Sequence, residues 1–459
     1  MNFGVMMRIV IVLLLITACA PTERLVSQST IGLPDAHAST EVFLAEGESY
    51  DLAATVVKKR IGENEVRMFG YNGQIPGPVL RVKQGSTVRI MFNNNLDMPS
   101  AVHWHGIRLD NRYDGVPDVT QPPVNPGASF EYVLRFPDAG VYWYHPHLRE
   151  DIQQELGLYG AIIVTPDAQG YYGDVDREQV VFLDDIRLTA GQPELFSLQA
   201  ANYVLMGRFG NTMLTNGVTS YALRAAAGER MRLYLINSAN TRTFNFSIEG
   251  HDLTVVGGDS GLYAQPFQAQ SVILGPSERA IIEMVLKEPG RYALRHTTPE
   301  SAYTLGVVDV AEGGEPRGLY KAAGHAAVAA DIARIMPYVD AKPNHVIDLT
   351  VDMQGMPMRH GMMMQDTEGI EWEDDMVMMN AMSTSDNTKW IIRDRATGAQ
   401  NMNLRYTHRV GDLVNVRLFN DPHSLHPMQH VIHLHGQRFL VLRENDKRND
   451  RLVWKDSVL

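Results

Sequence analysis

Cysteine is almost missing from this sequence of 459 residues, in which Cys19 stands alone. The chain beyond residue 19 therefore holds no disulfide and no thiolate ligand for a metal. Positive charge is also scarce, because 41 lysines and arginines face 53 aspartates and glutamates. The resulting net charge of −12 argues against a nucleic-acid partner. Long apolar runs are rare as well, and the run Ile9–Ile16 is too short to span a bilayer.

The first 40 residues are expected to lie outside the fold. Arg8 precedes the apolar run and Thr17-Ala18-Cys19 follows it, which is typical of a signal peptide over residues 1–19. This ending resembles a bacterial lipobox and implies a lipid anchor on Cys19, whereas the alternative is an ordinary secretory signal with an incidental cysteine. Residues 20–40 are polar and predict a flexible tether.

The lipobox resemblance also implies a location. It predicts the periplasmic side of a bacterial cell envelope, with membrane contact through the lipid anchor only. Ala20, where Asp is the other common choice, favours the outer membrane.

Short segments of alternating apolar residues, separated by Gly and Pro turns, predict an all-β chain of antiparallel sandwiches. Alternation places apolar side chains on one face of a strand in four stretches, which are residues 88–92, 130–136, 231–235 and 414–418. A frame that begins with Gly and ends with Asn nine positions later occurs three times, at 85–94, 228–237 and 411–420. Three copies predict three sandwich domains, over 41–165, 175–311 and 343–459. The linker 312–342 contains an Ala-rich stretch that predicts a short helix.

Histidines are paired in the outer two copies of this repeat. The pairs are His103/His105 and His145/His147 in the first copy and His433/His435 in the third, with His430 three residues before the last pair. The middle copy has Phe244-Asn245-Phe246 at the matching place. Because residues i and i+2 of a strand point to the same face, each pair presents two imidazoles side by side. One such pair is often a coincidence, but several pairs in a repeated frame indicate metal binding.

The ligand types restrict the metal. A structural zinc site closes with four ligands and favours cysteine, which is absent here. A dinuclear zinc hydrolase would mix carboxylates with the histidines, and none lies within the pairs. Imidazole suits copper, zinc, iron and nickel, and copper in several centres fits this set best.

The motifs then resemble a known family, the multicopper oxidases of the laccase-like type. His103-Trp104-His105-Gly106, Tyr144-His145-Pro146-His147 and the segment 430–436 resemble the first three copper signatures of that family, and residues 71–78 resemble its opening strand region. The resemblance implies three consecutive cupredoxin-like Greek-key β-sandwich domains, the third incomplete, with copper between the first and the third.

The resemblance also implies roles for the histidines. His103 and His433 would hold the type 2 copper, and His430 would be one ligand of the type 1 copper. The ligands of the type 3 pair would be His105, His145, His147 and His435. His426, in the insertion 421–429, is the alternative to His430, which is preferred because its offset to His433 matches the family pattern. Asp114 is expected either to pass protons to the centre or to be a turn aspartate before Gly115.

A further copper-ligand segment is expected beyond this sequence. The family supplies the type 1 thiolate from a His-Cys-His segment, and the complete protein would hold up to four copper ions: type 1, type 2 and a type 3 pair. The interval between the two pairs of the first domain, applied after His435, points to about residue 475. We therefore expect the sequence to be incomplete and without type 1 copper as it stands.

Methionine is concentrated between residues 353 and 382, where ten occur among acidic residues. Thioethers are soft donors that select Cu(I), so the segment predicts cuprous ion binding; a flexible loop with adaptable side chains is the alternative. The candidate ligands are Met356, Met358, Met362, Met363 and Met364.

These features predict an oxidase that couples one-electron oxidation of phenolic donors or Cu(I) to four-electron reduction of O2 to water. Two other functions are alternatives. A copper nitrite reductase usually has two domains per chain, which the three-copy repeat argues against. A non-catalytic copper-binding or copper-tolerance lipoprotein fits a chain that truly ends at residue 459. The sequence contains no signal for an oligomeric state.

Overall fold

The protein is described from a computed structural model, which covers residues 26–314, 318–319, 324–354, 369–422, 424 and 427–459. The predicted signal peptide, Cys19 and the methionines 356–364 lie outside the described residues, as do His423 and His426. The prediction of a flexible tether is wrong for residues 26–40, because their backbone is hydrogen-bonded to the first domain, with Ala36 N–H donating to the carbonyl oxygen of Lys58 and His37 N–H to that of Gly73. In this structure β-strands dominate, in agreement with the predicted all-β class. No helix in the described part is both long and apolar enough to cross a bilayer.

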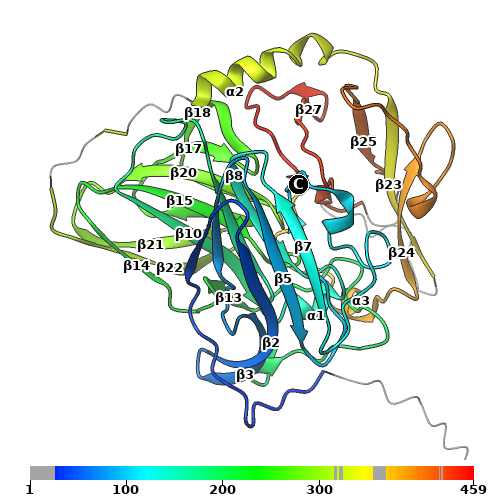
Figure 1. Ribbon diagram of the computed structural model, residues 1–459. Coiled ribbons are helices and arrows are strands. Elements are labelled where there is room, and N and C mark those ends of the chain that lie inside the picture. The colour runs from blue at the N-terminus through cyan, green and yellow to red at the C-terminus, as the bar shows by residue number, and fades with distance from the viewer. Residues whose placement is uncertain (1–25, 315–317, 320–323, 355–368, 423, 425–426) are drawn as a thin grey trace, which may run out of the picture.

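The first domain is a sandwich of two sheets that enclose one apolar core (Figure 1). One sheet has the strand order β1-β4-β9-β8-β6 and the other β3-β2-β5-β7. The strands are β1 Glu41–Leu44, β2 Ser49–Ile61, β3 Asn64–Tyr71, β4 Val79–Lys83, β5 Thr87–Asn95, β6 His103–His105, β7 Ser129–Arg135, β8 Gly140–His145 and β9 Gly160–Thr165. The short helix α1, Glu150–Gln153, follows β8. Val88, Ile90 and Phe92 are buried on one face of β5, as their alternation predicts.

The second domain is a larger sandwich, with sheets β13-β10-β15-β20-β17-β18 and β14-β22-β21-β16-β19. Its strands are β10 Arg177–Ile186, β11 Leu188–Thr189, β12 Gln192–Pro193, β13 Thr212–Thr215, β14 Ala222–Ala226, β15 Arg230–Asn237, β16 Phe244–Ile248, β17 Leu253–Gly258, β18 Gly261–Ala269, β19 Val272–Leu274, β20 Arg279–Val285, β21 Gly290–Thr297 and β22 Ala302–Ala311.

Strand β15 is buried on both faces. Met231, Leu233 and Leu235 point into the core of the second domain. Tyr234 and Ile236 point the other way, into a second core that is shared with Trp143 and other residues of the first domain. This shared core holds the first two domains together, because apolar area removed from water stabilises by about 25 cal/mol per Å².

The third region contains smaller sheets, β24-β23-β25, β26-β29 and β27-β28. Its elements are α2 Gly324–Ala333, β23 His345–Met353, α3 Val377–Met382, β24 Thr388–Asp394, β25 Val416–Asn420, β26 Ile432–His433, β27 Arg443–Glu444, β28 Lys447–Arg448 and β29 Ser457–Val458. Helix α2 occupies the Ala-rich part of the linker and packs on β18 (Figure 1).

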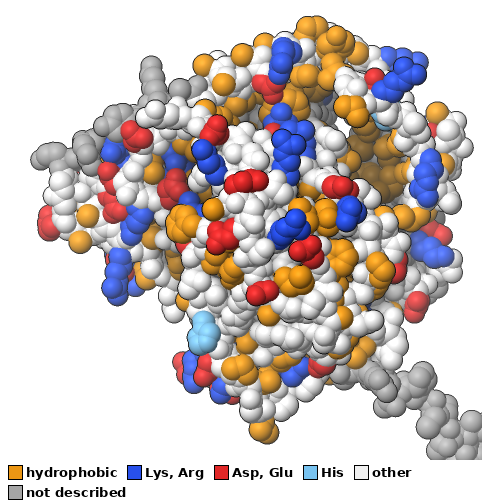
Figure 2. Space-filling model, in the orientation of Figure 1, with side chains coloured by type: hydrophobic (Ala, Val, Ile, Leu, Met, Phe, Trp, Pro, Cys, Tyr) orange, Lys and Arg blue, Asp and Glu red, His pale blue; other side chains and the backbone are white. Residues whose placement is uncertain are grey.

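Strand β25 differs from the other copies of the repeat. The frame 411–420 forms a strand only from Val416 onward, and Val416 and Leu418 are exposed. The reason is that no facing sheet of described residues covers β25, so this copy lacks the second layer that buries the alternating residues in the other two. Figure 2 shows a hollow with an apolar floor near this region, on a face where charges of both signs are interspersed.

Candidate metal centre

The two histidine pairs of the first domain lie on adjacent strands. β6 pairs antiparallel with β8, so that His103 lies opposite His145 and His105 lies opposite Trp143. The ring centroid of His103 is 5.4 Å from that of His105, 5.4 Å from that of His145 and 5.5 Å from that of His147. The strand period gathers His103, His105 and His145 on one side of the sheet, and His147, just beyond the end of β8, joins them.

The third region brings its own pair to the same place. β26 pairs with β29, and this pairing holds His433 beside Ser457. The rings of His433 and His435 lie 5.6 Å and 4.2 Å from the ring of His103, and His433 stacks on His105 at 3.7 Å. Six imidazoles from opposite ends of the chain thus surround one space.

Three sets of side chains in this space have ligand atoms within 4.8 Å of one another. They are His103/His433/His435, His103/His105/His145 and His105/His433/Asp456. The first set combines the first domain with the third region, and the second set lies entirely in the first domain. Overlapping sets of this kind suit several neighbouring metal ions rather than one.

The hydrogen bonds on the outer side of the rings determine which nitrogen faces the space. His103 Nδ1 donates to the carbonyl oxygen of Asp114 at 2.7 Å, and His433 Nδ1 donates to that of Asp456 at 2.8 Å. A carbonyl oxygen can only accept, so Nδ1 carries the proton and Nε2 keeps its lone pair. The Nε2 atoms of His103 and His433 are buried and have no hydrogen-bond partner. Oriented rings with free lone pairs are what metal-ligating histidines require.

In three of the other rings Nδ1 also faces a hydrogen-bond acceptor. His145 Nδ1 donates to the carbonyl oxygen of Pro146 at 2.8 Å, and His435 Nδ1 donates to Asp114 Oδ2 at 2.8 Å. His147 Nδ1 lies 3.2 Å from Glu150 Oε1. His105 is reversed: its Nε2 contacts Ser457 Oγ at 2.8 Å, and its Nδ1 lies 3.3 Å from His145 Nε2. The residues present therefore fit copper ions, which accept neutral imidazole nitrogens.

Burial keeps these imidazoles neutral. It lowers the pKa of His103, with the hydrogen bond to Asp114 opposing it, and holds the pKa values of His105 and His145 well below the usual range. Burial also lowers the pKa of His433 to about 3. At neutral pH these rings need not release a proton before they bind a metal ion.

Asp114 lies between the two ends of the chain. Its carboxylate is buried and contacts His435 from the third region, while its backbone contacts His103 of the first domain. Burial alone would raise the pKa of Asp114, but the hydrogen bonds with His103 and His435 hold it well below its usual value. The aspartate is therefore part of the centre, and it also precedes Gly115 in a turn with φ of +79°.

Two residues of the centre were missed by the sequence analysis. Asp456 and Ser457 lie beside His105 and His433, with Asp456 Oδ1 3.3 Å from His105 Nε2 and Ser457 Oγ 3.2 Å from His433 Nδ1. The only signal in the sequence is a short polar segment, Lys455-Asp456-Ser457, between the apolar residues 453–454 and 458–459. Such an acid must find a partner when it is buried.

Aromatic side chains wall the centre on the side of the first domain. The Trp143 ring stacks on His145 at 4.1 Å and lies 5.3 Å from His105. Trp143, Trp104 and Tyr144 are fully buried. These walls exclude water from one side of the histidine cluster.

His430 lies in different surroundings, outside the three sets of ligand atoms found among the described residues. Its ring packs edge-on against Trp390 at 5.2 Å, and burial lowers its pKa. Trp390 belongs to an apolar cluster whose sulfur-bearing members are Met206, Met353, Met376, Met379 and Met428. The histidine predicted for the type 1 copper is thus next to a group of thioethers.

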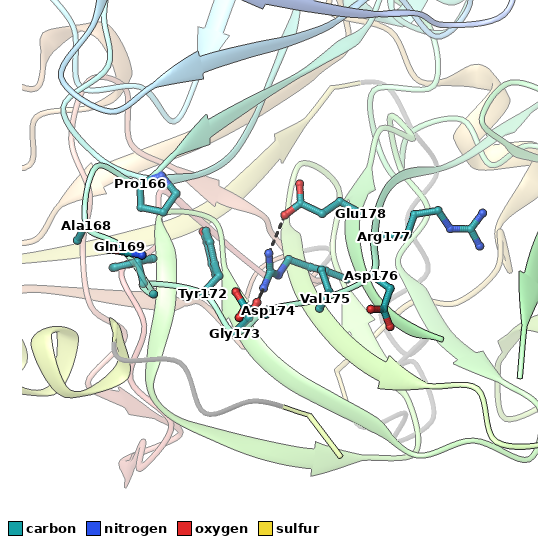
Figure 3. A pocket seen from close by; sticks show the side chains of 13 residues that line it. Pro166, Ala168, Gln169, Tyr172, Gly173, Asp174, Val175, Asp176, Arg177 and Glu178 are labelled. Carbon is teal, nitrogen blue, oxygen red and sulfur yellow. Dashed lines mark hydrogen bonds and ion pairs between the residues drawn. The ribbon is translucent and has the colours of Figure 1, made fainter. Parts of the chain in front are cut away.

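A pocket of about 470 Å³ lies elsewhere, between the end of β9 and the start of β10 (Figure 3). Its lining includes Asp174, Asp176 and Glu178, and none of the histidines named above. The guanidinium of Arg232 in its wall is paired with Glu178 and Glu283. The pocket is therefore separate from the histidine cluster and does not contribute to it.

Comparison with known proteins agrees with this geometry. Two family models, both described as multicopper oxidase, match residues 54–169 and 182–311. Multicopper oxidase MmcO of Mycobacterium tuberculosis is 31% identical over 251 residues, which are 48% of this chain and 48% of that protein. Copper resistance protein A of Escherichia coli is 26% identical over 392 residues, which are 74% of this chain and 60% of that protein. The chain spans about half the length, or less, of the first curated relatives it matches.

Solved structures extend the similarity to the fold. A multi-copper oxidase from Pseudomonas thermotolerans matches with a TM-score of 0.57 and 26% identity, over 68% of this chain and 73% of that one. A multi-copper oxidase from Pediococcus acidilactici matches over 92% of this chain and 82% of that one, with a TM-score of 0.65. At 20% identity this second match shows the fold alone. The family matches over more than half of the residues, together with imidazoles from both ends of the chain around one space, show that the chain belongs to the multicopper oxidases, whose cofactor is copper.

Proposed function

We propose that this protein is a copper-dependent oxidase that couples one-electron oxidation of a small donor to four-electron reduction of O2 to water. The observation that carries the proposal is the convergence of six imidazoles from the first domain and the third region around one space. Copper, when bound by these residues, would supply the one-electron redox chemistry that this reaction requires.

The proposed ligands follow the positions of the rings. His103 and His433, whose Nε2 atoms are both free, would hold the type 2 copper. His105, His145, His147 and His435 would hold the type 3 pair, and His430 would be one ligand of the type 1 copper. The described residues include no cysteine, so they do not supply the thiolate of a type 1 centre.

The protein's own groups have two tasks at the centre. Backbone carbonyls and Asp114 orient the rings, so that little reorganisation is needed when metal ions bind. Asp114 also keeps a buried negative charge beside two imidazoles, and we propose that its carboxylate accepts and passes the protons that oxygen reduction consumes.

The donor is proposed to be a phenol or Cu(I), delivered near His430. The thioethers around Trp390 are soft ligands that suit Cu(I). Glu371 lies close by, since its N–H donates to Gln429 Oε1 at 3.1 Å and Gln429 precedes His430. Both carboxylate oxygens of Glu371 are buried without a hydrogen-bond partner, and burial together with Asp375 and Asp374 raises its pKa to about 7. A cation bound beside Glu371 would stabilise the charged form of its carboxyl group.

We propose that the protein is located in the bacterial cell envelope. The segment from Arg8 to Cys19 supports export followed by a lipid anchor on Cys19. The anchor is tested by growing bacteria that express the protein with a palmitate analogue. We expect the label on the wild-type protein and no label on the Cys19→Ala variant. Label on both proteins, or on neither, would contradict it.

The test of function uses the complete gene product, purified with copper. Oxygen consumption is measured with 2,6-dimethoxyphenol and with Cu(I), beside the copper content of each sample. We expect turnover with at least one donor, and its loss in His103→Ala and His433→Ala. The matched control is His251→Ala, since His251 belongs to the middle domain and its ring contacts Glu249 and Tyr292 of that domain. Copper-loaded protein that consumes no oxygen with either donor would refute the proposal.

A further inference from the structure

The middle domain has no histidine pair, but one of its arginines reaches the centre. Arg279 opens β20 and is fully buried where the three parts of the chain meet. Its Nε donates to the carbonyl oxygen of Val141 in the first domain at 3.0 Å. Its two Nη atoms donate to the two carboxylate oxygens of Asp456 at 2.6 and 2.5 Å. One guanidinium thus ties the middle domain to both of its neighbours.

Asp456 links Arg279 to the histidines of the centre. Its Oδ1 lies 3.3 Å from His105 Nε2, and its carbonyl oxygen accepts from His433 Nδ1. The next residue, Ser457, contacts the same two rings through its hydroxyl. His105 and His433, whose rings stack on each other across the interface, are therefore both oriented by the segment 456–457. Arg279 holds this segment in place.

Arg279 belongs to a buried network of two cations and three anions. Asp259, which is fully buried, lies 3.5 Å from Arg279 Nη1 and also pairs with Lys455 at 3.3 Å. Lys455 makes a second pair with Glu278 at 3.0 Å. A bidentate guanidinium satisfies both oxygens of Asp456 in a fixed plane, which a lysine at the same place cannot do.

Asp456 is also closely packed against the backbone of the first histidine motif. Gly106, the residue after His105, approaches the ion pair so closely that a Cβ atom there would lie 2.8 Å from both Arg279 Nη2 and Asp456 Cγ. The backbone of the first histidine motif, the carboxylate and the guanidinium therefore fit against one another as a single unit.

We propose that Arg279 is a positioning residue of the copper centre: it holds Asp456 and Ser457 so that His105 and His433 present their lone pairs correctly across the interface. The middle domain thereby contributes to the centre without providing a ligand. This inference rests on the proposed function, because it presumes that these rings bind copper.

The test compares two variants with a matched control. Arg279→Met removes both the positive charge and the bidentate hydrogen bonds to Asp456, whereas Arg279→Lys keeps the charge but loses the bidentate geometry. Arg232→Met is the control, because Arg232 is another buried arginine of the middle domain, paired with Glu283 at 2.5 Å and away from the histidines. All proteins are prepared as complete gene products. Copper affinity and the EPR signal of the type 2 copper are measured, beside thermal stability.

We expect Arg279→Met to bind the type 2 copper about 10- to 100-fold more weakly and to change its EPR hyperfine splitting. Arg279→Lys, which is expected to fold even if Arg279→Met does not, should show the same change in the EPR signal with a smaller loss of affinity. Arg232→Met should lose stability but keep the wild-type EPR signal. An unchanged EPR signal and affinity in Arg279→Lys, or the same change in Arg232→Met, would overturn the inference. If the wild-type protein itself bound no copper, the proposed function would fail instead.

Discussion

Replacement of Gly106 by alanine should disturb both the stability and the metal centre. Gly106 has φ of +87°, where an L-residue other than glycine costs about 1–2 kcal/mol. The added Cβ would also displace the Arg279–Asp456 pair, and complete rupture of a buried pair costs about 3–5 kcal/mol. With the pair fully broken, we therefore expect Gly106→Ala to lower the free energy of unfolding by about 4–7 kcal/mol.

Gly85 provides a matched control. It has the same φ of +87°, but a Cβ there would meet nothing within 4 Å. Gly85→Ala should therefore lose only the conformational term of about 1–2 kcal/mol. Urea unfolding of the metal-free proteins, followed by far-UV circular dichroism, gives the two values, and the copper retained after dialysis gives the effect on the centre. Equal losses in the two variants, or wild-type copper content in Gly106→Ala, would refute the reasoning.

Three other substitutions separate stability from function. Burial raises the pKa of Glu155 to about 7 from its usual 4.5, so its contribution to stability is complete below pH 4.5 and is lost as pH rises through 7. Glu155→Gln should therefore stabilise by up to about 3 kcal/mol at pH 8 and by little at pH 4.5 in urea unfolding, and a gain that is the same at both pH values would contradict this. Met428→Leu, which nearly conserves volume, should slow oxidation of Cu(I) at least about tenfold and that of 2,6-dimethoxyphenol less than twofold, since only Cu(I) needs the thioether; equal effects on both donors would count against a cuprous site. The Asp114→Asn variant should retain copper but lower kcat about 100-fold with little change in KM for the donor, as expected for loss of a proton-transfer group. An unchanged kcat would show that Asp114 has only a structural role in the turn.

The sequence predicted those features that have a local signature. The His-x-His pairs, their common face and the alternation of β5 all depend on the two-residue period of a strand, which is visible in any short segment. The convergence of the outer pairs depended on the family resemblance, because no local pattern places residues 103 and 433 side by side. The prediction of a short helix in the linker also agrees with α2.

Features that arise from contacts between distant segments were not predicted. The pairing of Arg279 with Asp456 joins residues far apart in the sequence, and neither residue lies in a distinctive motif. Burial of both faces of β15 depends on the first domain packing against it, so alternation alone indicates only one buried face. The exposure of Val416 and Leu418 likewise depends on which layer covers β25 and not on the residues themselves.

The central claim is that imidazoles from the two ends of the chain share copper ions at one interface. Anomalous diffraction at the copper absorption edge, on crystals of the complete copper-loaded protein, tests it most directly. The account predicts a copper peak bonded to Nε2 of both His103 and His433, with further peaks beside His105, His145, His147 and His435. Copper found only outside this space, or bonded to rings from one end of the chain alone, would contradict the account.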